Sequence, residues 1–175
     1  MRAIDDMESG LRRLENDPDS VILAVHGTTR SVPGGGVKGG YGVFVSGFAE
    51  RLNRRGLLPY LSSQTVELAE LLAALEAVKI VHTLIFADQN ISHVVIKTTS
   101  EYLVNGMADL VWIWAGREYN NTNGNPLTNG RPFKYLHEEV SLLEKSYGIR
   151  VSFCKVEKEF NEPAAALAQE AVKRL

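Results

Sequence analysis

Residues 62–78, SSQTVELAELLAALEAV, form the most strongly patterned segment of the chain. Apolar side chains recur in this segment at three- and four-residue spacing, at Leu68, Leu71, Leu72, Leu75 and Val78. The spacing predicts a helix with one apolar face toward a core, and Ser62 or Ser63 can cap its first turn. Glu67 would then lie near the start of the helix, where a carboxylate complements the positive end of the helix dipole.

The composition indicates one compact domain with a sizeable core and a short extension. The chain has 175 residues, of which 45% are hydrophobic, and a formal net charge of -2. No apolar run reaches the ~18 residues of a membrane span, and the first residues lack the pattern of a secretion signal. Cys154 is the single cysteine, which excludes an internal disulfide and a zinc site built from cysteines. These features favour an intracellular protein, nuclear or cytoplasmic, with no membrane partner, and the charge argues against a broad basic surface for nucleic acid.

Residues 1–20 differ from the rest in carrying six acidic and three basic side chains. Ile4, Met7, Leu11 and Leu14 recur at helical spacing, and the helix-breaking stretch NDPD follows at 16–19. We therefore expect residues 1–20 to be an amphipathic helical extension that packs on the domain or on a partner, with the main domain at 21–175.

The order of elements along residues 21–175 indicates an α/β fold. Apolar runs predict strands at 21–26, 41–46, 57–61, 93–98 and 149–156, and the remaining pattern predicts helices from Ser62, from Ser100, at 136–147 and at 164–175. Strands that alternate with helices imply parallel pairs with crossovers. We expect a mixed five-stranded sheet, three antiparallel strands followed by two parallel to the first, flanked by helices. Its expected core includes Val25, Leu68, Leu71, Leu75 and Val95.

Short segments in the same order resemble the signature segments of the ribonuclease H family, in the form common in filamentous fungi. They are VHGT at 25–28, GYGV at 40–43, the segment at 62–78, TTSEYLVNG at 98–106, GNPLTN at 124–129 and KEFNEPAAALA at 158–168. The resemblance covers nearly all of residues 20–175 and implies a ribonuclease H-like fold.

The resemblance also implies a reaction, and the residues of this chain depart from what that reaction needs. In the family, four acidic residues hold two Mg²⁺ ions around the scissile RNA phosphate of an RNA/DNA hybrid. The corresponding positions here are His26, Glu67, Thr99 and Ala165. One carboxylate cannot hold two Mg²⁺ ions, because these ions require hard oxygen ligands, whereas His26 offers nitrogen, Thr99 a neutral hydroxyl and Ala165 nothing. We therefore expect a catalytically inactive domain with no metal and no other cofactor, in which Glu67 bonds to Thr99 or His26.

Two alternatives to this interpretation remain open. Glu70, Glu101 and Glu162 lie near the changed positions, but each is expected to point elsewhere, since shifts of one or two residues change the face of a strand or helix. A zinc site at His26 and Glu67 has only two ligands in view, where a structural site needs four. The alternative function is a metal-dependent ribonuclease H with an altered site, which would use Mg²⁺ to cleave the RNA strand of RNA/DNA hybrids.

The resemblance further implies where ligands would contact the chain. Backbone groups at Gly27 and Thr28 and the side chains of Ser63, Gln64 and Asn129 stand where the family contacts the nucleic-acid backbone. The family has a basic residue just before its acid, whereas this chain has Ser63-Gln64-Thr65 before Glu67. The chain therefore lacks a positive charge that would favour phosphate. We therefore expect a scaffold or protein-interaction module. Its contact surface would be the N-terminal helix or the groove in which the family binds its RNA/DNA hybrid, called the old groove below. RNA/DNA hybrid or RNA is a second candidate ligand, and a homo-oligomer is compatible with the sequence.

Overall fold

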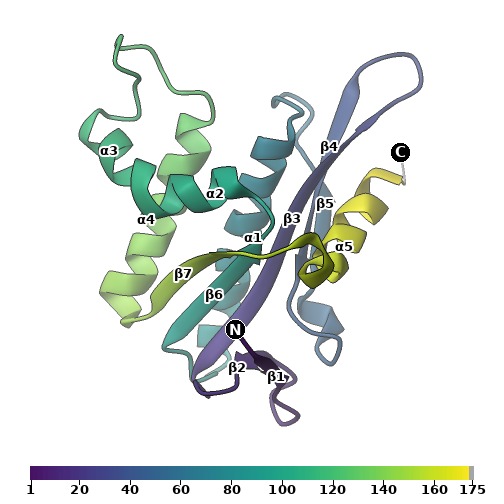
Figure 1. Cartoon of the computed structure of the whole chain (residues 1–175), viewed down its shortest axis with the longest axis vertical. Coiled ribbons are helices and arrows are strands. Elements are labelled where there is room, and N and C mark those ends of the chain that lie inside the picture. Colours follow the sequence, from purple (N-terminus) through teal and green to yellow (C-terminus); the bar gives the residue numbers. More distant parts are fainter. Residues whose placement is uncertain (174–175) are drawn as a thin grey trace.

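A mixed five-stranded sheet forms the centre of the computed structural model, which describes residues 1–173 (Figure 1). Its strands are β3 (Ser20–Ser31), β4 (Val37–Phe44), β5 (Arg54–Leu57), β6 (His93–Thr98) and β7 (Arg150–Lys155), in the spatial order β5-β4-β3-β6-β7. β4 runs antiparallel to β3 and β5, whereas β6 runs parallel to β3 and β7. The sheet predicted from the sequence is confirmed in strand number and in strand direction.

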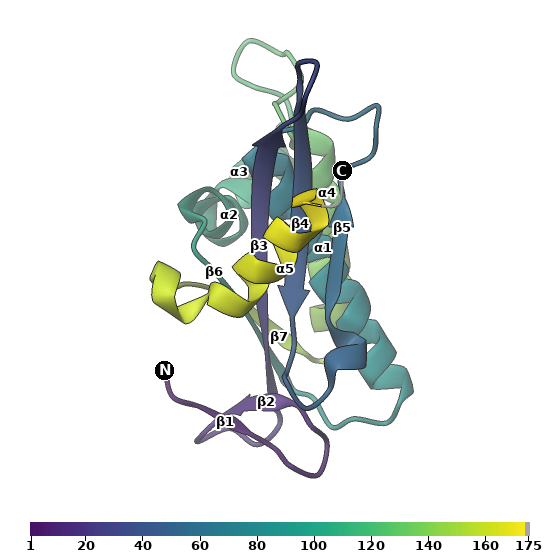
Figure 2. The same cartoon turned by 90° about the vertical axis from the view of Figure 1, so that its right-hand side faces the viewer.

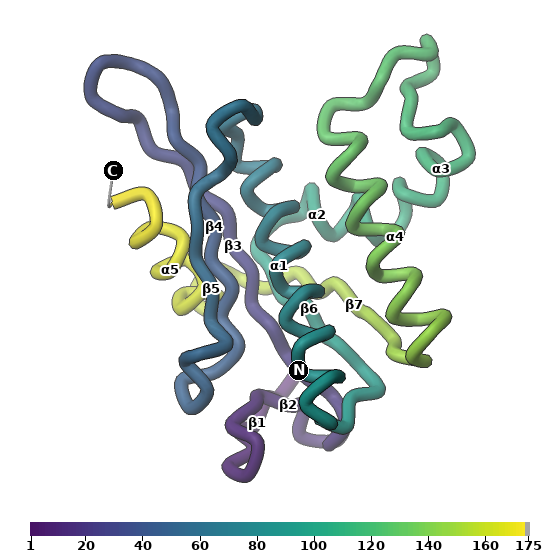
Figure 3. The backbone as a smooth tube through the Cα atoms, turned by 180° about the vertical axis from the view of Figure 1, so that it is seen from behind, coloured from purple at the N-terminus to yellow at the C-terminus, as the bar shows by residue number. Residues whose placement is uncertain are grey.

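Helices cover both faces of the sheet. α1 (Val66–Phe86) crosses one face with α4 (Gly130–Tyr147) beside it (Figure 3). Three short segments, α2 (Glu101–Asn105), the π-helix η2 (Gly106–Leu110) and α3 (Val111–Gly116), continue that layer. The last helix, α5 (Glu162–Lys173), lies on the opposite face over β3 and β4 (Figure 2). Within residues 1–173, no helix combines the length and apolarity that a membrane span requires.

Close backbone approach fixes α5 against the sheet. A Cβ placed on Gly42 of β4 would lie 2.4 Å from the carbonyl oxygen of Ala164, and one on Gly40 would lie 2.7 Å from a methyl group of Val172. Side chains at these two positions would push the helix away from the strand. Glycine in the GYGV segment therefore sets the distance between α5 and β4.

The expected core is confirmed, while several element boundaries are corrected. Val25, Leu68, Leu71, Leu75 and Val95 are all buried. Helix α1 is capped by Thr65, whose hydroxyl accepts the Leu68 N–H at 3.2 Å, so the prediction of Ser62 or Ser63 as the cap is wrong. The third strand, β5, ends at Leu57, near where the sequence pattern placed its start. Ser100 does cap α2, and Gly148, at φ 65°, does end α4, which begins as early as Gly130.

The N-terminal extension is a β-hairpin and not the predicted amphipathic helix. β1 (Ala3–Asp5) pairs with β2 (Arg12–Leu14), and the connecting turn passes through Gly10 at φ 76°. Leu11 is buried in the main core, whereas Ile4 and Met7 are 44% and 71% exposed. The four apolar residues therefore do not form one face. The extension packs on the domain, as expected. It does so through the strand β2 and not through the apolar face of a helix.

Minor 3₁₀ turns complete the fold. They are η1 (Glu50–Leu52), before β5, and η3 (Lys158–Phe160), which leads from β7 into α5.

Candidate functional site

A pocket opens where the two central parallel strands separate. β3 and β6 pair only as far as Ala24 and Lys97, so His26 on β3 and Thr99 after β6 lie beyond the paired region. The strand order reverses between β3 and β6, and ligands of open α/β sheets bind at such a point. The pocket has a volume of about 290 Å³. It is lined by His26, Thr99, Lys155, Val156, Glu157, Lys158, Asn161, Ala165 and Gln169.

Asn161 positions the α5 side of this pocket. Its amide nitrogen donates a 2.9 Å hydrogen bond to the Val25 carbonyl of β3, and its side chain is almost fully buried. The bond fixes the start of α5 next to His26, which brings Ala165 to the pocket wall. The structure therefore brings together three of the four predicted site positions, His26, Thr99 and Ala165.

Glu70, and not Glu67, is the acid that completes this group. Its carboxylate enters the gap between the strands, where one oxygen accepts the Gly27 N–H at 2.9 Å and the other accepts the Thr98 hydroxyl at 3.2 Å. The first oxygen also lies 3.7 Å from His26 Nδ1. Glu67 is exposed one turn earlier on α1. The expectation that Glu67 bonds to Thr99 or His26 is therefore wrong, as is the expectation that Glu70 points away.

The cause of this correction is the helix start. With Thr65 as the cap, Glu67 falls in the first turn at the open end of the helix, while Glu70 falls one turn further, over the sheet. A Cβ on Gly27 would lie 2.4 Å from the Glu70 backbone nitrogen, so the strand and helix touch at this point. One sequence signal pointed to Glu70, because it is an acid between two apolar pairs, Leu68-Ala69 and Leu71-Leu72.

Burial favours the neutral forms of both His26 and Glu70. It raises the pKa of Glu70 to about 7, against the opposing effect of the hydrogen bonds from Gly27 and Thr98. It lowers the pKa of His26, and the nearby Lys158 ammonium lowers it further. His26 Nδ1 is buried and has no hydrogen-bond partner in the described part of the chain. The contact between His26 and Glu70 is thus not a strong ion pair near neutral pH.

The residues at the pocket do not fit a pair of Mg²⁺ ions. The remaining acids considered from the sequence, Glu101 and Glu162, are exposed, and Glu101 instead pairs with Lys155 at 3.8 Å. Over residues 1–173, no three His, Cys, Asp or Glu side chains lie together in a way that could hold a metal ion. Both Glu70 oxygens are used by protein donors, and His26 supplies nitrogen where Mg²⁺ prefers oxygen.

Most of the predicted nucleic-acid contacts serve the fold itself. Gly27 and Thr28 lie inside β3 and not at a turn, and the Gly27 N–H is bonded to Glu70. Gln64 accepts the Gly39 N–H at 2.9 Å and donates to the Pro59 carbonyl at 2.9 Å, so its amide holds the loop before α1. Ser63 is exposed and available.

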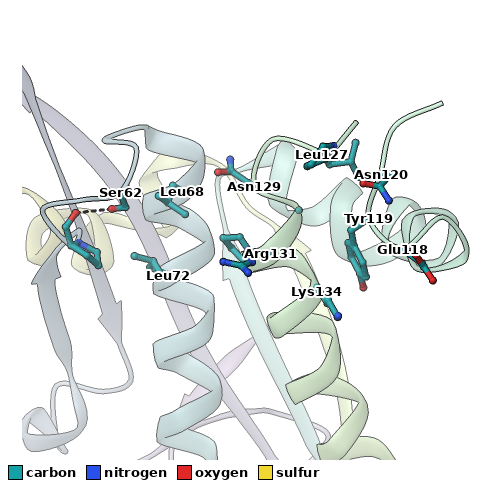
Figure 4. A pocket seen from close by; sticks show the side chains of 14 residues that line it. Ser62, Leu68, Leu72, Glu118, Tyr119, Asn120, Leu127, Asn129, Arg131 and Lys134 are labelled. Carbon is teal, nitrogen blue, oxygen red and sulfur yellow. Dashed lines mark hydrogen bonds between the residues drawn. The ribbon is translucent and has the colours of Figure 1, made fainter. Parts of the chain in front are cut away.

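Asn129 lies at a second, larger cavity between the start of α1 and the start of α4 (Figure 4). This cavity has a volume of about 710 Å³, and Leu68 and Leu72 form its α1 wall. Asn129 adopts a left-handed conformation at φ 57° and donates to the Tyr102 hydroxyl at 3.3 Å. The cavity is lined by Pro59, Ser62, Leu68, Leu72, Glu118, Tyr119, Asn120, Pro126, Leu127, Asn129, Gly130, Arg131, Pro132 and Lys134.

The fold and the pocket define a ribonuclease H-like α/β domain, and comparison with known proteins agrees. The chain matches the family model described as RNase H over residues 19–173. It therefore belongs to the RNase H family. No curated protein sequence matches it.

Solved structures share this fold at low sequence identity. A foamy viral protease-reverse transcriptase in complex with dsDNA is 19% identical with a TM-score of 0.64, covering 88% of this chain and 94% of that one. LC11-RNase H1, isolated from compost by a metagenomic approach, is 20% identical with a TM-score of 0.61, covering 89% and 97%. LC9-RNase H1 is 25% identical with a TM-score of 0.59, covering 87% and 72%.

Proposed function

We propose that this chain is a pseudo-ribonuclease H, a catalytically inactive RNase H domain that works as a binding module. The observation that carries the proposal is the neutral set His26, Thr99 and Ala165 at three of the four positions where the family holds metal. The fourth group, Glu70, is engaged by Gly27 and Thr98. Two-metal hydrolysis needs carboxylates that bridge and flank the ions, and one buried carboxylate cannot supply them.

The test is cleavage of an RNA/DNA hybrid by the purified chain in Mg²⁺ or Mn²⁺. We expect no cleavage above that of a Glu70→Gln variant, which keeps the shape of the side chain but removes its charge. The alternative function, a ribonuclease H with an altered metal site, predicts metal-dependent cleavage that Glu70→Gln abolishes and Glu67→Gln leaves intact. That result would overturn the pseudo-enzyme proposal.

A protein partner at the old groove is the binding role that the surface favours. Tyr60 and Leu61 lie between Pro59 and Ser62, which line the larger cavity, and these two side chains are 83% and 94% exposed. Large apolar side chains at the rim of a cavity with apolar walls are typical of protein interaction sites. The N-terminal hairpin exposes Ile4 and Met7, but the cavity beside them is lined mainly by charged and polar side chains, which favours a protein partner less.

Capture of partners from the native cell would test this role, with and without nuclease treatment. We expect nuclease-resistant partners whose capture Leu61→Asp reduces. Phe86→Asp is the matched control, because Phe86 is 81% exposed at the far end of α1. Capture that disappears on nuclease treatment, or that both variants reduce equally, would contradict a protein site at the groove. Nucleic acid would remain the ligand in the first case, as in LC11-RNase H1, which has been solved in complex with an RNA/DNA hybrid.

A further inference from the structure

A third cavity lies on the face of the sheet that carries α5, at the half formed by β6 and β7. On this face α5 packs over β3, β4 and β5, whereas β6 and β7 border a cavity closed by the N-terminal segment. The cavity has a volume of about 410 Å³ and shares no lining residue with the pocket beside His26. Its chemistry is therefore independent of the family's metal positions.

Three side chains in this cavity form a connected row of hydroxyl, imidazole and carboxylate. His93 begins β6, and the parallel pairing places Ser152 of β7 opposite Val95, so His93 and Ser152 share one face of the sheet. His93 Nε2 lies 3.0 Å from the Ser152 hydroxyl oxygen, and Nδ1 lies 3.2 Å from a carboxylate oxygen of Asp17, before β3. These are the distances expected of a nucleophile, its base and the acid that orients the base.

The Asp17 carboxylate determines which nitrogen of the His93 ring carries the proton. An ionised carboxylate only accepts hydrogen bonds, so Nδ1 must donate to it, and Asp17 has no other side-chain partner among residues 1–173. Nε2 is then the acceptor, and the Ser152 hydroxyl donates to it. The Arg150 guanidinium lies 3.1 Å from Nδ1 and cannot donate to a nitrogen that already carries a proton. Its positive charge opposes formation of an imidazolium at His93.

The lining of the cavity suits an uncharged ester. Leu14 and Val95 provide apolar wall for an acyl group. The Asn16 side chain lines the cavity without a hydrogen-bond partner in the described part of the chain, so its amide is free to donate to an oxyanion. The carboxylates of Glu15 and Asp17 outnumber the Arg2 guanidinium, which disfavours phosphate esters.

We propose that Ser152, His93 and Asp17 form a second catalytic site, which hydrolyses carboxylic esters of short apolar acyl groups. The Ser152 oxygen attacks the acyl carbon while its proton passes to His93 Nε2, and the bond to the alcohol oxygen breaks as that oxygen takes the proton. Water then gives a proton to Nε2, and its oxygen attacks the acyl-serine. The acyl–oxygen bond to Ser152 breaks, the acid leaves, and the proton returns to the Ser152 oxygen.

Hydrolysis of p-nitrophenyl butyrate by the purified chain tests this inference. We expect Ser152→Ala to lower kcat about a hundredfold or more, because the nucleophile is lost. Ser141→Ala, at another half-buried serine on α4, is the control and should leave kcat unchanged. p-Nitrophenyl phosphate should not be turned over, and a preference for it would contradict the charge of the cavity.

Two further variants test the roles of the groups around His93. Asp17 is a positioning residue, so Asp17→Asn should lower kcat at least about tenfold with KM unchanged, since it no longer selects the Nδ1–H tautomer. Arg150→Gln should raise kcat severalfold, because a cation beside the imidazolium is removed. A loss of activity in Arg150→Gln would mean that Nδ1 accepts from Arg150, and this would overturn the assignment of His93 as a base.

Covalent labelling gives a test that does not depend on the folding of any variant. An alkyl fluorophosphonate should add its phosphonyl group to the unmodified chain as the P–F bond breaks and fluoride leaves. Peptide fragmentation should place the label on Ser152. Absence of this label, labelling of the neighbouring Cys154 instead, or ester hydrolysis no faster than that of Ser152→Ala would overturn the site. None of these results bears on hybrid cleavage, so the pseudo-enzyme proposal is tested separately.

Discussion

Glu70 is held by the Gly27 N–H and the Thr98 hydroxyl in a place where its side chain is only 3% exposed. Its pKa of about 7, against an ordinary 4.5, means that the folded chain retains a proton that the unfolded chain releases. Both states are protonated below about pH 4.5, so the stability that this group contributes is fully present there. The free energy of unfolding should then fall as the pH rises toward 7 and level off above it.

Glu70→Gln should remove this pH dependence. A glutamine oxygen can still accept the Gly27 N–H, and its amide can donate to Thr98, so the variant resembles the protonated acid. The 2.5-unit difference in the pKa of Glu70 sets an upper bound of about 3 kcal/mol on the gain in stability at pH 8. Urea unfolding at pH 4 and pH 8 measures it. Glu67→Gln, at an exposed position, should show no such change, and an equal response of both variants would contradict the buried role of Glu70.

Restoring the family's acids tests the site from the other direction. The triple variant His26→Asp, Thr99→Asp and Ala165→Asp places three carboxylates near Glu70, and their repulsion should lower the thermal midpoint in EDTA. Mg²⁺ should then raise that midpoint, because it binds the native state. Differential scanning fluorimetry with and without Mg²⁺ measures both effects.

A further substitution identifies the fourth ligand. Glu70→Gln added to the triple variant should remove the Mg²⁺ response, whereas Glu67→Gln should preserve it. The reverse pattern would show that Glu67 completes the site.

At the residue scale, sequence patterns located His26, Thr99 and Ala165 but not the acid that accompanies them. Glu67 and Glu70 both follow an apolar residue and precede a leucine, and only the apolar pairs on both sides of Glu70 favour it over Glu67. The position of the cap decides between them, and Ser62, Ser63 and Thr65 are all good caps. The structure decides, because the Gln64 amide holds the loop before α1 and the Thr65 hydroxyl accepts the Leu68 N–H.

At the scale of elements, the N-terminal hairpin depends on one apolar anchor. Leu11 is 1% exposed and belongs to the main core, so Leu11→Ala should destabilise the chain by about 2–4 kcal/mol. For a chain of this size, that corresponds to a fall of roughly 4–16 °C in the thermal midpoint. Met7→Ala, at an exposed position of the same hairpin, should change stability by less than about 0.5 kcal/mol. Equal effects would mean that the hairpin does not dock through Leu11.

The hairpin also shows why the helical prediction for residues 1–20 failed. Spacing alone cannot tell a helix stripe from a short hairpin when only four apolar residues are present. Polar contacts decide here, since the Arg13 guanidinium is buried and bonds to Asp6 at 2.9 Å and to the Ser20 carbonyl at 3.0 Å. Such side-chain contacts are not visible in the periodicity, whereas the strands of the sheet follow from continuous apolar runs.

At the scale of the whole molecule, the fold does not depend on the residues that stand at the family's metal positions. The sheet order, the crossing of α5 over β4 and the buried faces depend on apolar residues and glycines, none of which binds a metal ion. Replacing crowded carboxylates by neutral side chains removes a repulsion that only bound metal would relieve. The domain should therefore fold without divalent ions.

Its thermal midpoint should be the same, within about 1 °C, in EDTA and in millimolar Mg²⁺ or Mn²⁺ at matched ionic strength. A domain that bound these ions at a hundred times their dissociation constant would gain about 2.7 kcal/mol. At this chain length, such a gain would raise the midpoint by roughly 5–11 °C, which is easily measured. The restored triple variant is the positive control. A rise of the midpoint above the salt control in the unmodified chain, abolished by Glu70→Gln, would mean that Glu70 and its neutral neighbours suffice to hold a cation. The pocket lined by Lys155 and Lys158 would then be the outer edge of a metal site.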